Sequence, residues 1–402
     1  MNDEASRLIL REMERAGVTV ETEQMLDRLE GRRITPGKDL PRMEFLFRLF
    51  HKPCFPRGEL VALSGKAKSG KTFVSSILMA LCQRSPVLSL ERIEPGRLRV
   101  LWYDTEQSEE STQDILKNRI LPMVGNTAPA PGPSPAMGVG IDVFNVRGEM
   151  YADRLPLLEV AVRQYRPDLV VVDGIRDLVA DINDGVVAQD TIERLMRLAS
   201  EVRCCMVCVL HQNKGIEDRN LRGWIGTELS NKDFEEYECV KSSERIFTFV
   251  QIKTRKYDIG QKLEFAVNDD GIPYLCTPEQ LLEAQYNAQR KAAAEMQRGG
   301  RGISKLPEFN PRYVRGKENR KTVFDLRLLF ADCMEAGRQY RADELKQIVG
   351  VKANILKDKV YEEQVERAVS EGIIMQSYDG CQKRVYLRPV VQAELNFEET
   401  PR

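Results

Sequence analysis

The residues with the clearest chemical purpose form one short run near the start of the chain. Its glycines allow backbone amides to turn inward around phosphate groups, and Lys71 can reach the β- and γ-phosphates of a nucleotide. The Thr72 hydroxyl can ligate Mg²⁺. The complete pattern predicts a P-loop that takes ATP and Mg²⁺. The run reads Gly65-Lys66-Ala67-Lys68-Ser69-Gly70-Lys71-Thr72.

Apolar segments on both sides of this run support the same interpretation. Residues 60–64 read Leu-Val-Ala-Leu-Ser and predict a short strand, whereas residues 72–81 predict a helix. A helix that begins at Thr72 points its positive end at bound phosphate. A coincidental glycine-containing loop is the alternative, but it explains neither the strand before the run nor the helix after it.

Two acidic residues after predicted strands can complete such a site. Asp173 ends the apolar strand 168–173, where its carboxylate can provide a second ligand for Mg²⁺. Glu106 follows the strand 99–104 and can aim water at the γ-phosphate as a base. Asp104 is the alternative base, and an aspartate that ends a buried strand can also lack a catalytic role. We favour a catalytic site that uses Asp173 and Glu106.

Strands and helices alternate from residue 58 onward, which predicts an α/β fold with a parallel sheet. Two later segments alternate apolar and polar residues and predict antiparallel strands that close the sheet. The segment 122–140 is rich in proline, alanine and glycine and is expected to be a loop. The predicted parallel strands cover 60–64, 99–104, 168–173 and 204–210, the helices 72–81, 155–165 and 191–202, and the antiparallel strands 246–253 and 262–267.

A second, smaller module is predicted near the C-terminus, with three helices followed by two strands in the order of a winged-helix domain. Its third helix carries three glutamates, which disfavours contact with DNA phosphates. A structural or protein-binding role is therefore as good an expectation as DNA binding. The helices are predicted over 323–336, 342–349 and 355–370, and the strands over 373–378 and 383–387.

The composition is that of a soluble globular protein, with 42% hydrophobic residues, 30% charged residues and a formal net charge of −1. Any surface for a polyanion must therefore be local. The nine cysteines show no spacing typical of zinc, and no stretch has the character of a signal peptide or a membrane span. We expect reduced thiols in a cytoplasmic protein without membrane contact.

These motifs, in this order, resemble the RecA-like ATPases and, among them, the hexameric replicative helicases of the RepA and DnaB type. The resemblance covers residues 58–271. It implies that Glu106 is the catalytic glutamate and that Asp173 is the Walker B aspartate. It also implies that His211, with Gln212 adjacent, is a sensor that couples the γ-phosphate to DNA, although a lone histidine can be structural.

The family also carries a Lys-x-Arg pair that projects into the nucleotide site of a neighbouring subunit, and Lys253-Thr254-Arg255 matches this pair. A guanidinium supplied across the interface would stabilise charge that develops on the γ-phosphate. The alternative is a basic strand end that faces solvent. If Arg255 acts across an interface, the active enzyme is a homo-oligomer, and the resemblance implies a hexameric ring.

The motifs and the resemblance together divide the chain into five parts. Ile9, Met13 and Ala16 lie at helical spacing in the first part, which is either a solvated extension or an arm that docks on a neighbouring subunit. The five parts are an N-terminal helical arm (1–40), a RecA-like ATPase domain (41–275), a basic linker (276–321), a winged-helix-like domain (322–392) and a tail (393–402).

The segment 214–232 is the predicted contact with single-stranded DNA, because it is a basic loop at the sheet edge where ligands gather. Trp224 within it can stack on a base or belong to the core. The acidic loop 181–185 is a poor phosphate binder. The basic residues proposed to touch DNA are Lys214, Arg219, Arg222 and Lys232.

The leading hypothesis is an ATP-driven DNA helicase or translocase of plasmid or mobile-element replication. One alternative is a recombination-type ATPase that assembles on DNA without unwinding it. Another is a regulatory ATPase whose nucleotide state switches partner binding through the C-terminal module. The chain shows no primase-like N-terminal domain, so primer synthesis would require a primase or initiator partner.

Overall fold

A computed structural model describes residues 20–125, 140–213, 220–243, 245–298, 309–318 and 321–390. The chain divides after Glu44 into two units. The first unit contains helix α2 (Val20–Gly31), on which Met25, Leu26 and Leu29 are exposed. The helix predicted around Ile9, Met13 and Ala16 lies outside the described residues.

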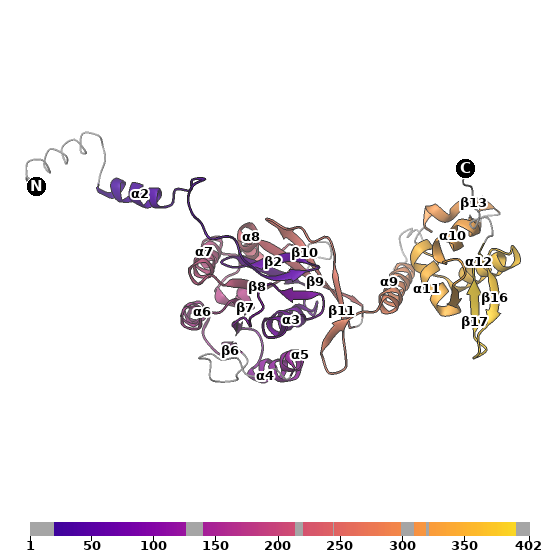
Figure 1. Ribbon diagram of the computed structural model, residues 1–402, viewed down its shortest axis with the longest axis horizontal. Helices are drawn as coiled ribbons and strands as arrows, with labels where there is room; N and C mark the ends of the chain where they lie inside the picture. The colour runs from indigo at the N-terminus through magenta and orange to yellow at the C-terminus, as the bar shows by residue number, and fades with distance from the viewer. Residues whose placement is uncertain are drawn as a thin grey trace, which may run out of the picture. The chain divides into compact units, whose positions relative to one another are not determined.

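A nine-stranded sheet forms the centre of the second unit (Figure 1). Six neighbouring strands are parallel, and the remaining three continue the sheet in antiparallel pairing. The predicted α/β fold with a largely parallel sheet is therefore confirmed. The strand order is β12 (Pro273–Leu275), β11 (Leu263–Val267), β10 (Ile246–Thr254), β9 (Glu235–Ser243), β3 (Leu60–Gly65), β8 (Cys205–His211), β7 (Leu169–Asp173), β5 (Val100–Asp104) and β6 (Ile141–Asn145).

Helices cover both faces of the parallel strands, which explains why these strands are almost continuously apolar. Helix α3 (Lys71–Gln83) packs on one face, where Trp102 is fully buried. The opposite face is covered by α6 (Tyr151–Tyr165), α7 (Gly185–Val202) and α8 (Gly223–Lys232) (Figure 1).

Smaller elements border the sheet. One is a three-stranded sheet of β1 (Phe45–Leu49), β2 (Lys52–Pro56) and β4 (Leu90–Arg92). The chain after β5 winds through α4 (Glu109–Ile115), a π-helical segment (Leu116–Ile120) and α5 (Leu121–Val124). The loop predicted over 122–140 is therefore wrong at its start, where α5 continues the preceding helices, and residues 126–139 lie outside the described part.

Strand β9 was not predicted, although it lies between β3 and β10. Its sequence contains Glu235, Glu236 and Glu238, whose side chains are all buried. Charged residues in a central strand remove the apolar pattern on which strand prediction depends. This strand is therefore recognised from its pairing with β3 and β10 and not from its own sequence pattern.

The segment predicted as a DNA-binding loop over 214–232 is partly helical, because α8 occupies its second half. The sequence did not predict this helix because it contains Gly223 and Gly226, and glycine has a low helix propensity. Gly226 is required by close packing: a Cβ atom there would lie 2.6 Å from the Leu221 backbone carbonyl carbon. The predicted linker 276–321 likewise begins with a helix, α9 (Pro278–Arg298).

The C-terminal region contains three helices and a small sheet of order β15-β17-β16. The first helix begins later than predicted because Asp325 caps it: its carboxylate accepts the N–H of Leu328 at 3.1 Å. The winged-helix assignment stays a prediction. The elements are a 3₁₀ turn (Pro311–Tyr313), β13 (Val314–Glu318), β14 (Lys321–Phe324), α10 (Leu326–Cys333), β15 (Gln339–Arg341), α11 (Ala342–Ala353), α12 (Asp358–Ser370), β16 (Met375–Tyr378) and β17 (Arg384–Leu387).

None of the helices in the described ranges combines the length and the apolar character needed to cross a lipid bilayer.

Candidate nucleotide site

The carboxyl ends of the parallel strands bring the predicted site residues to one end of the sheet. Gly65, which opens the P-loop, pairs in register with His211 at the end of β8. Asp104 at the end of β5 pairs with Asp173 at the end of β7. Glu106 follows two residues after Asp104. The sheet order therefore places the P-loop beside His211, and the two acidic strand ends next to it.

The backbone of the P-loop requires glycine at both ends. Gly65 has φ +151°, and a Cβ atom there would lie 2.3 Å from Ser69 Oγ and 2.5 Å from the Cys239 carbonyl oxygen. Gly70 has φ +103°, and its Cβ atom would lie 2.6 Å from the ring of Phe247. Gly70 is also the N-cap of α3 and has no side chain to cap it, so the first amides of this helix can bind phosphate oxygens.

Lys71 is buried beneath the loop, with 8% of its surface exposed. Its ammonium group donates to the carbonyl oxygens of Gly65 and Lys66, both at 3.0 Å, and lies 3.1 Å from His211 Nδ1. Burial lowers the pKa of Lys71, and the nearby Glu106 and Asp173 carboxylates oppose that shift. The charged lysine is held where phosphate can replace its carbonyl partners.

The contact with Lys71 determines the tautomer of His211. An ammonium group can only donate, so His211 Nδ1 must accept, and the ring proton then lies on Nε2. Nε2 faces Glu106, with 3.8 Å between Nε2 and Oε2. His211 therefore lies between Lys71 and the candidate base Glu106, and its role as a sensor stays a prediction.

Asp173 has the properties of a cation ligand. It is 4% exposed, and its Oδ2 atom has no hydrogen-bond partner among the described residues. Burial raises its pKa to about 7, and the charges of Asp104 and Glu106 add to this shift. A buried carboxylate oxygen without a partner is unfavourable unless a cation reaches it.

The residues present fit Mg²⁺ bound together with a nucleotide. No cluster of three or more His, Cys, Asp or Glu side chains in the described ranges could hold a metal by itself. Magnesium in nucleotide sites usually binds to one or two protein groups and to substrate phosphates. Thr72 and Asp173 would supply those protein groups.

Glu106 and Asp104 differ in a way that favours Glu106 as the base. Asp104 is fully buried, and its carboxylate already accepts hydrogen bonds from two backbone amides and from the Thr112 hydroxyl. Glu106 has 39% of its side chain exposed. The adjacent His211 ring lowers the pKa of Glu106, although partial burial acts in the opposite direction. Glu106 is therefore ionised at neutral pH and accessible to water.

Sequence reasoning missed one polar contact at the same end of the sheet. Gln212 donates from Nε2 to Glu238 Oε1 at 2.8 Å, and both side chains are buried. This bond joins the end of β8 to β9 across β3. Glu238 gave no signal in the sequence, because its strand was not predicted.

Lys253 and Arg255 lie at the opposite end of the sheet. Thr254 between them pairs with Glu235, and Glu235 pairs with Val61 near the start of β3, whereas the P-loop follows the end of β3. The two residues are therefore not brought to the P-loop of their own chain.

Both basic side chains of this pair have partners within the chain. Lys253 Nζ lies 2.8 Å from the buried Asp233 carboxylate. Arg255 donates to the backbone carbonyl oxygens of Asp233 at 2.9 Å and Asn231 at 3.0 Å, which stabilises the end of α8. Any contact with a γ-phosphate would have to be with that of another chain.

The predicted DNA-binding residues are only partly placed. Arg222 is the N-cap of α8 and Lys232 lies in its last turn, so the two residues are at opposite ends of one helix. Lys214 and Arg219 lie outside the described residues. Trp224 is 53% exposed, so it does not belong to the core. Its backbone N–H donates to Ile182 at 2.8 Å, which places the acidic loop 181–185 beside α8.

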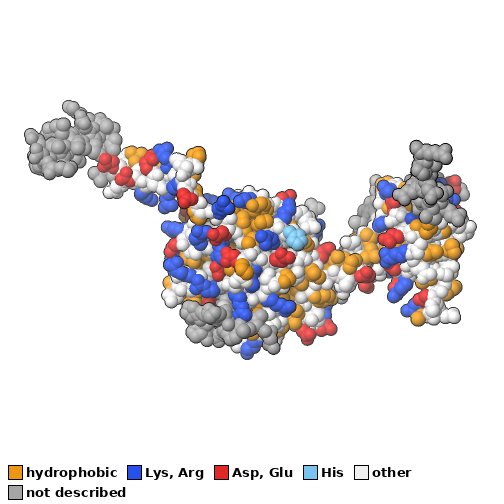
Figure 2. Space-filling view, viewed as in Figure 1, with side chains coloured by type: hydrophobic (Ala, Val, Ile, Leu, Met, Phe, Trp, Pro, Cys, Tyr) orange, Lys and Arg blue, Asp and Glu red, His pale blue; other side chains and the backbone are white. Residues whose placement is uncertain are grey.

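Figure 2 shows positive and negative side chains interspersed on the face in view, without a continuous basic surface. This mixture agrees with the net charge of −1.

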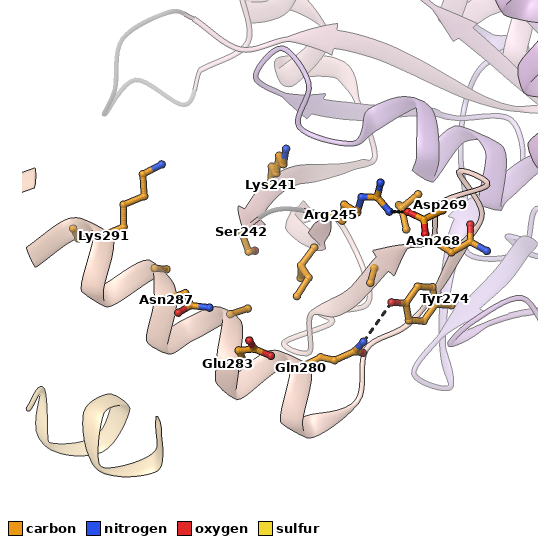
Figure 3. A pocket seen from close by; sticks show the side chains of 16 residues that line it. Lys241, Ser242, Arg245, Asn268, Asp269, Tyr274, Gln280, Glu283, Asn287 and Lys291 are labelled. Carbon is orange, nitrogen blue, oxygen red and sulfur yellow. Dashed lines mark hydrogen bonds and ion pairs between the residues drawn. The ribbon is translucent and has the colours of Figure 1, made fainter. Parts of the chain in front are cut away.

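An open cavity of about 1170 Å³ lies away from the P-loop, between the β9–β10 hairpin and α9 (Figure 3). Arg245 pairs with Asp269 on its wall, and Gln280 Nε2 donates to the Tyr274 hydroxyl at 3.3 Å. Its lining carries both signs of charge, so it does not select an anion or a cation.

Comparison with known proteins agrees with this geometry. Residues 46–217 match the family model described as an AAA domain. The family model describes a P-loop ATPase domain found in RecA-like and helicase-type proteins, and this segment is similar to it. Such domains bind nucleotides, typically with Mg²⁺, and the match indicates ATP hydrolysis.

The match includes the P-loop, Glu106, Asp173 and His211, and it ends before Lys253. It covers less than half of the 402 residues, and no curated protein matches the chain. The match supports the predicted P-loop ATPase over this segment, whereas the likeness to RepA and DnaB stays a prediction.

Replacement of Asp173 by asparagine should stabilise the nucleotide-free protein at pH 8. The pKa of Asp173 is about 7 in the folded chain and ordinarily 3.8, so between these values only the folded chain keeps the proton. The contribution of Asp173 to stability therefore falls as the pH rises from about 4 to about 7. We expect Asp173→Asn to raise the melting temperature by about 2 °C or more at pH 8.

Thermal unfolding in magnesium-free buffer at pH 5 and pH 8 measures this effect. The gain should be smaller at pH 5, where wild-type Asp173 is already neutral in the fold. An equal gain at both pH values would contradict the assignment of a buried, partnerless carboxylate.

Proposed function

We propose that this chain is the subunit of an oligomeric ATP-driven motor that moves along single-stranded DNA and unwinds duplex DNA. The observation that supports it most strongly is the meeting of Lys71, His211, Glu106 and Asp173 at the end of the parallel sheet. In this arrangement His211 lies between Lys71 and Glu106, and Asp173 lies at the end of the neighbouring strand β7.

Each group has a separate task in the proposed hydrolysis. The amides of the P-loop and the Lys71 ammonium bind the phosphate oxygens. Thr72 and Asp173 would hold Mg²⁺, which when bound neutralises charge on the phosphates. Glu106 orients water and accepts its proton, which its lowered pKa permits at neutral pH.

His211 gives the site a means to sense the γ-phosphate. Lys71 must exchange its carbonyl partners for phosphate when ATP binds, so the contact between Lys71 and His211 changes with nucleotide state. The residues after His211 lead into the segment 214–232, the proposed DNA contact. Trp224, exposed at the start of α8, offers a surface on which a base can stack.

The position of Lys253 and Arg255 supports an oligomer. They cannot serve their own P-loop, because they lie at the other end of the sheet. In the proposed assembly they reach the nucleotide of a neighbouring chain, and a closed ring, by resemblance a hexamer, gives every site such a neighbour. Replication of plasmid or mobile-element DNA, with a primase or initiator partner, is the role that we propose for this ring.

Replacement of Glu106 by glutamine tests the motor directly. We expect Glu106→Gln to bind ATP normally but to hydrolyse it at least ~10²-fold more slowly, because the variant cannot accept the proton of water. Glu110→Gln is the matched control, since Glu110 is an exposed glutamate on the next helix. ATP hydrolysis and strand displacement on a forked duplex are measured together.

Wild-type protein and Glu110→Gln should displace the strand with ATP and Mg²⁺, and Glu106→Gln should not. Hydrolysis that DNA stimulates without displacement would support the alternative of an ATPase that assembles on DNA. Hydrolysis indifferent to DNA would instead favour the regulatory ATPase.

Mixing two inactive variants tests the shared site. Lys71→Ala removes the phosphate-binding lysine and Arg255→Ala removes the proposed trans-acting residue. In a mixture, some interfaces combine an intact P-loop from one chain with an intact Arg255 from its neighbour. We expect the mixture to recover ATPase activity that neither variant has by itself. Normal hydrolysis by Arg255→Ala with DNA present would refute the role of Arg255.

A further inference from the structure

The turn that carries Glu106 is held by a buried network of hydrogen bonds. Asp104 Oδ1 accepts the backbone N–H groups of Glu106 and Gln107, both at 3.1 Å. Its other oxygen, Oδ2, accepts the Thr112 hydroxyl at 2.6 Å. Asp104 is fully buried and Thr112 is 4% exposed, so water does not compete for these bonds.

Asn145, at the end of the neighbouring strand β6, completes the network. Its Nδ2 atom lies 2.7 Å from the Thr112 hydroxyl and 2.9 Å from the Gln107 carbonyl oxygen. The hydroxyl has one proton and two acceptors in reach, Asp104 Oδ2 at 2.6 Å and the Ser108 carbonyl oxygen at 3.1 Å, and the nearer, charged carboxylate is the stronger acceptor. The hydroxyl can only accept from the Asn145 amide. The Asn145 amide therefore donates to the Thr112 hydroxyl, which donates to the Asp104 carboxylate. Each group fixes the orientation of the next.

The same turn is attached to β7 on its other side. Thr105 donates its hydroxyl towards the carbonyl oxygens of Asp173 and Gly174, each at 3.0 Å. Gly174 has φ +106°, and a Cβ atom there would lie 2.7 Å from Glu106 Cγ. The backbone of Glu106 is thus fixed relative to the strand that carries the candidate metal ligand.

We propose that Asp104, Thr112 and Asn145 are positioning residues that direct Glu106 towards the nucleotide site; we call these three residues the clamp. This inference rests on the proposed function, in which Glu106 aims water at the γ-phosphate. It gives Asp104 a role that differs from that of a base, since both its oxygens are occupied.

The geometry explains why Glu106 needs the clamp. Its carboxylate is partly exposed and lies 3.8 Å from His211, which is longer than a hydrogen bond. The direction of its side chain is therefore set mainly by the backbone of the turn. A displacement of 1 Å at a reacting group can lower a rate by about 10²-fold. No clamp residue belongs to the P-loop, so the clamp should affect hydrolysis and leave ATP binding unchanged.

Three threonine variants test the clamp. Thr112→Val removes the hydroxyl and nearly keeps the shape, Thr112→Ser keeps the hydroxyl, and Thr191→Val changes a buried threonine of α7 outside the clamp. Single-turnover hydrolysis at saturating Mg·ATP and the Kd of a fluorescent ATP analogue are measured for each. We expect Thr112→Val to lower the rate by roughly 10- to 100-fold with little change in Kd. Thr112→Ser should restore most of the rate, and Thr191→Val should match wild type.

Combination with Glu106→Gln separates positioning from a general structural effect. If Thr112 acts through Glu106, Thr112→Val should cause no further loss in the Glu106→Gln background. A further loss of the same factor, or a loss of ATP binding, would overturn the proposal. Asn145→Leu, on the edge strand β6, removes both donated bonds and should reproduce the effect even if Thr112→Val does not fold.

The controls distinguish the two claims. If wild-type protein and Thr191→Val do not hydrolyse ATP, the proposed function itself fails. If both hydrolyse ATP and Thr112→Val and Asn145→Leu are equally active, only the clamp is wrong.

Discussion

The rest of the structure depends on the charges that meet where the parallel strands end. Asp104, Glu106 and Asp173 bring three carboxylates to one place, with Lys71 as the buried cation beside them. Asp104 is satisfied by backbone amides and by Thr112, whereas Asp173 keeps an oxygen without a partner among the described residues. Such a site is incomplete without ligands: it needs a cation at Asp173 and an anion at Lys71, and a magnesium–triphosphate complex supplies both.

A second group of buried charges lies on and beside β9. Burial raises the pKa of Asp233 and of Glu235 to about 7, and the nearby ammonium of Lys253 opposes the shift at Asp233. Glu238, further along the same strand, bonds to Gln212 beside the P-loop. Polar side chains therefore occur along the whole of β9, from the end of the sheet near Lys253 to the end near the nucleotide site. This arrangement accounts for acidic residues in a central strand, where apolar ones are usual.

The sequence was sufficient to predict those parts of the fold and site that depend on local pattern. Each of the parallel strands β3, β5, β7 and β8 is an apolar run followed by a short polar motif such as the P-loop. The structure contains these strands close to their predicted ranges. The residues missed were those whose role arises from neighbours distant in sequence. Asn145 ends β6, which the sequence did not predict. Glu238 lies in β9, whose glutamates interrupt the apolar pattern expected of a strand. Lys253 and Arg255 were found by spacing, but only the antiparallel pairing of β10 shows that they lie at the far end of the sheet.

Equilibrium binding of ATP to the nucleotide-free protein, followed by calorimetry with and without magnesium, tests the central claim most directly. The account predicts one ATP per chain, bound more tightly when magnesium is present, because Asp173 contributes only through the metal. If folded protein does not bind ATP, or binds it with the same affinity with and without magnesium, the account is contradicted, because it requires Lys71 and Asp173 to bind a metal–triphosphate complex together.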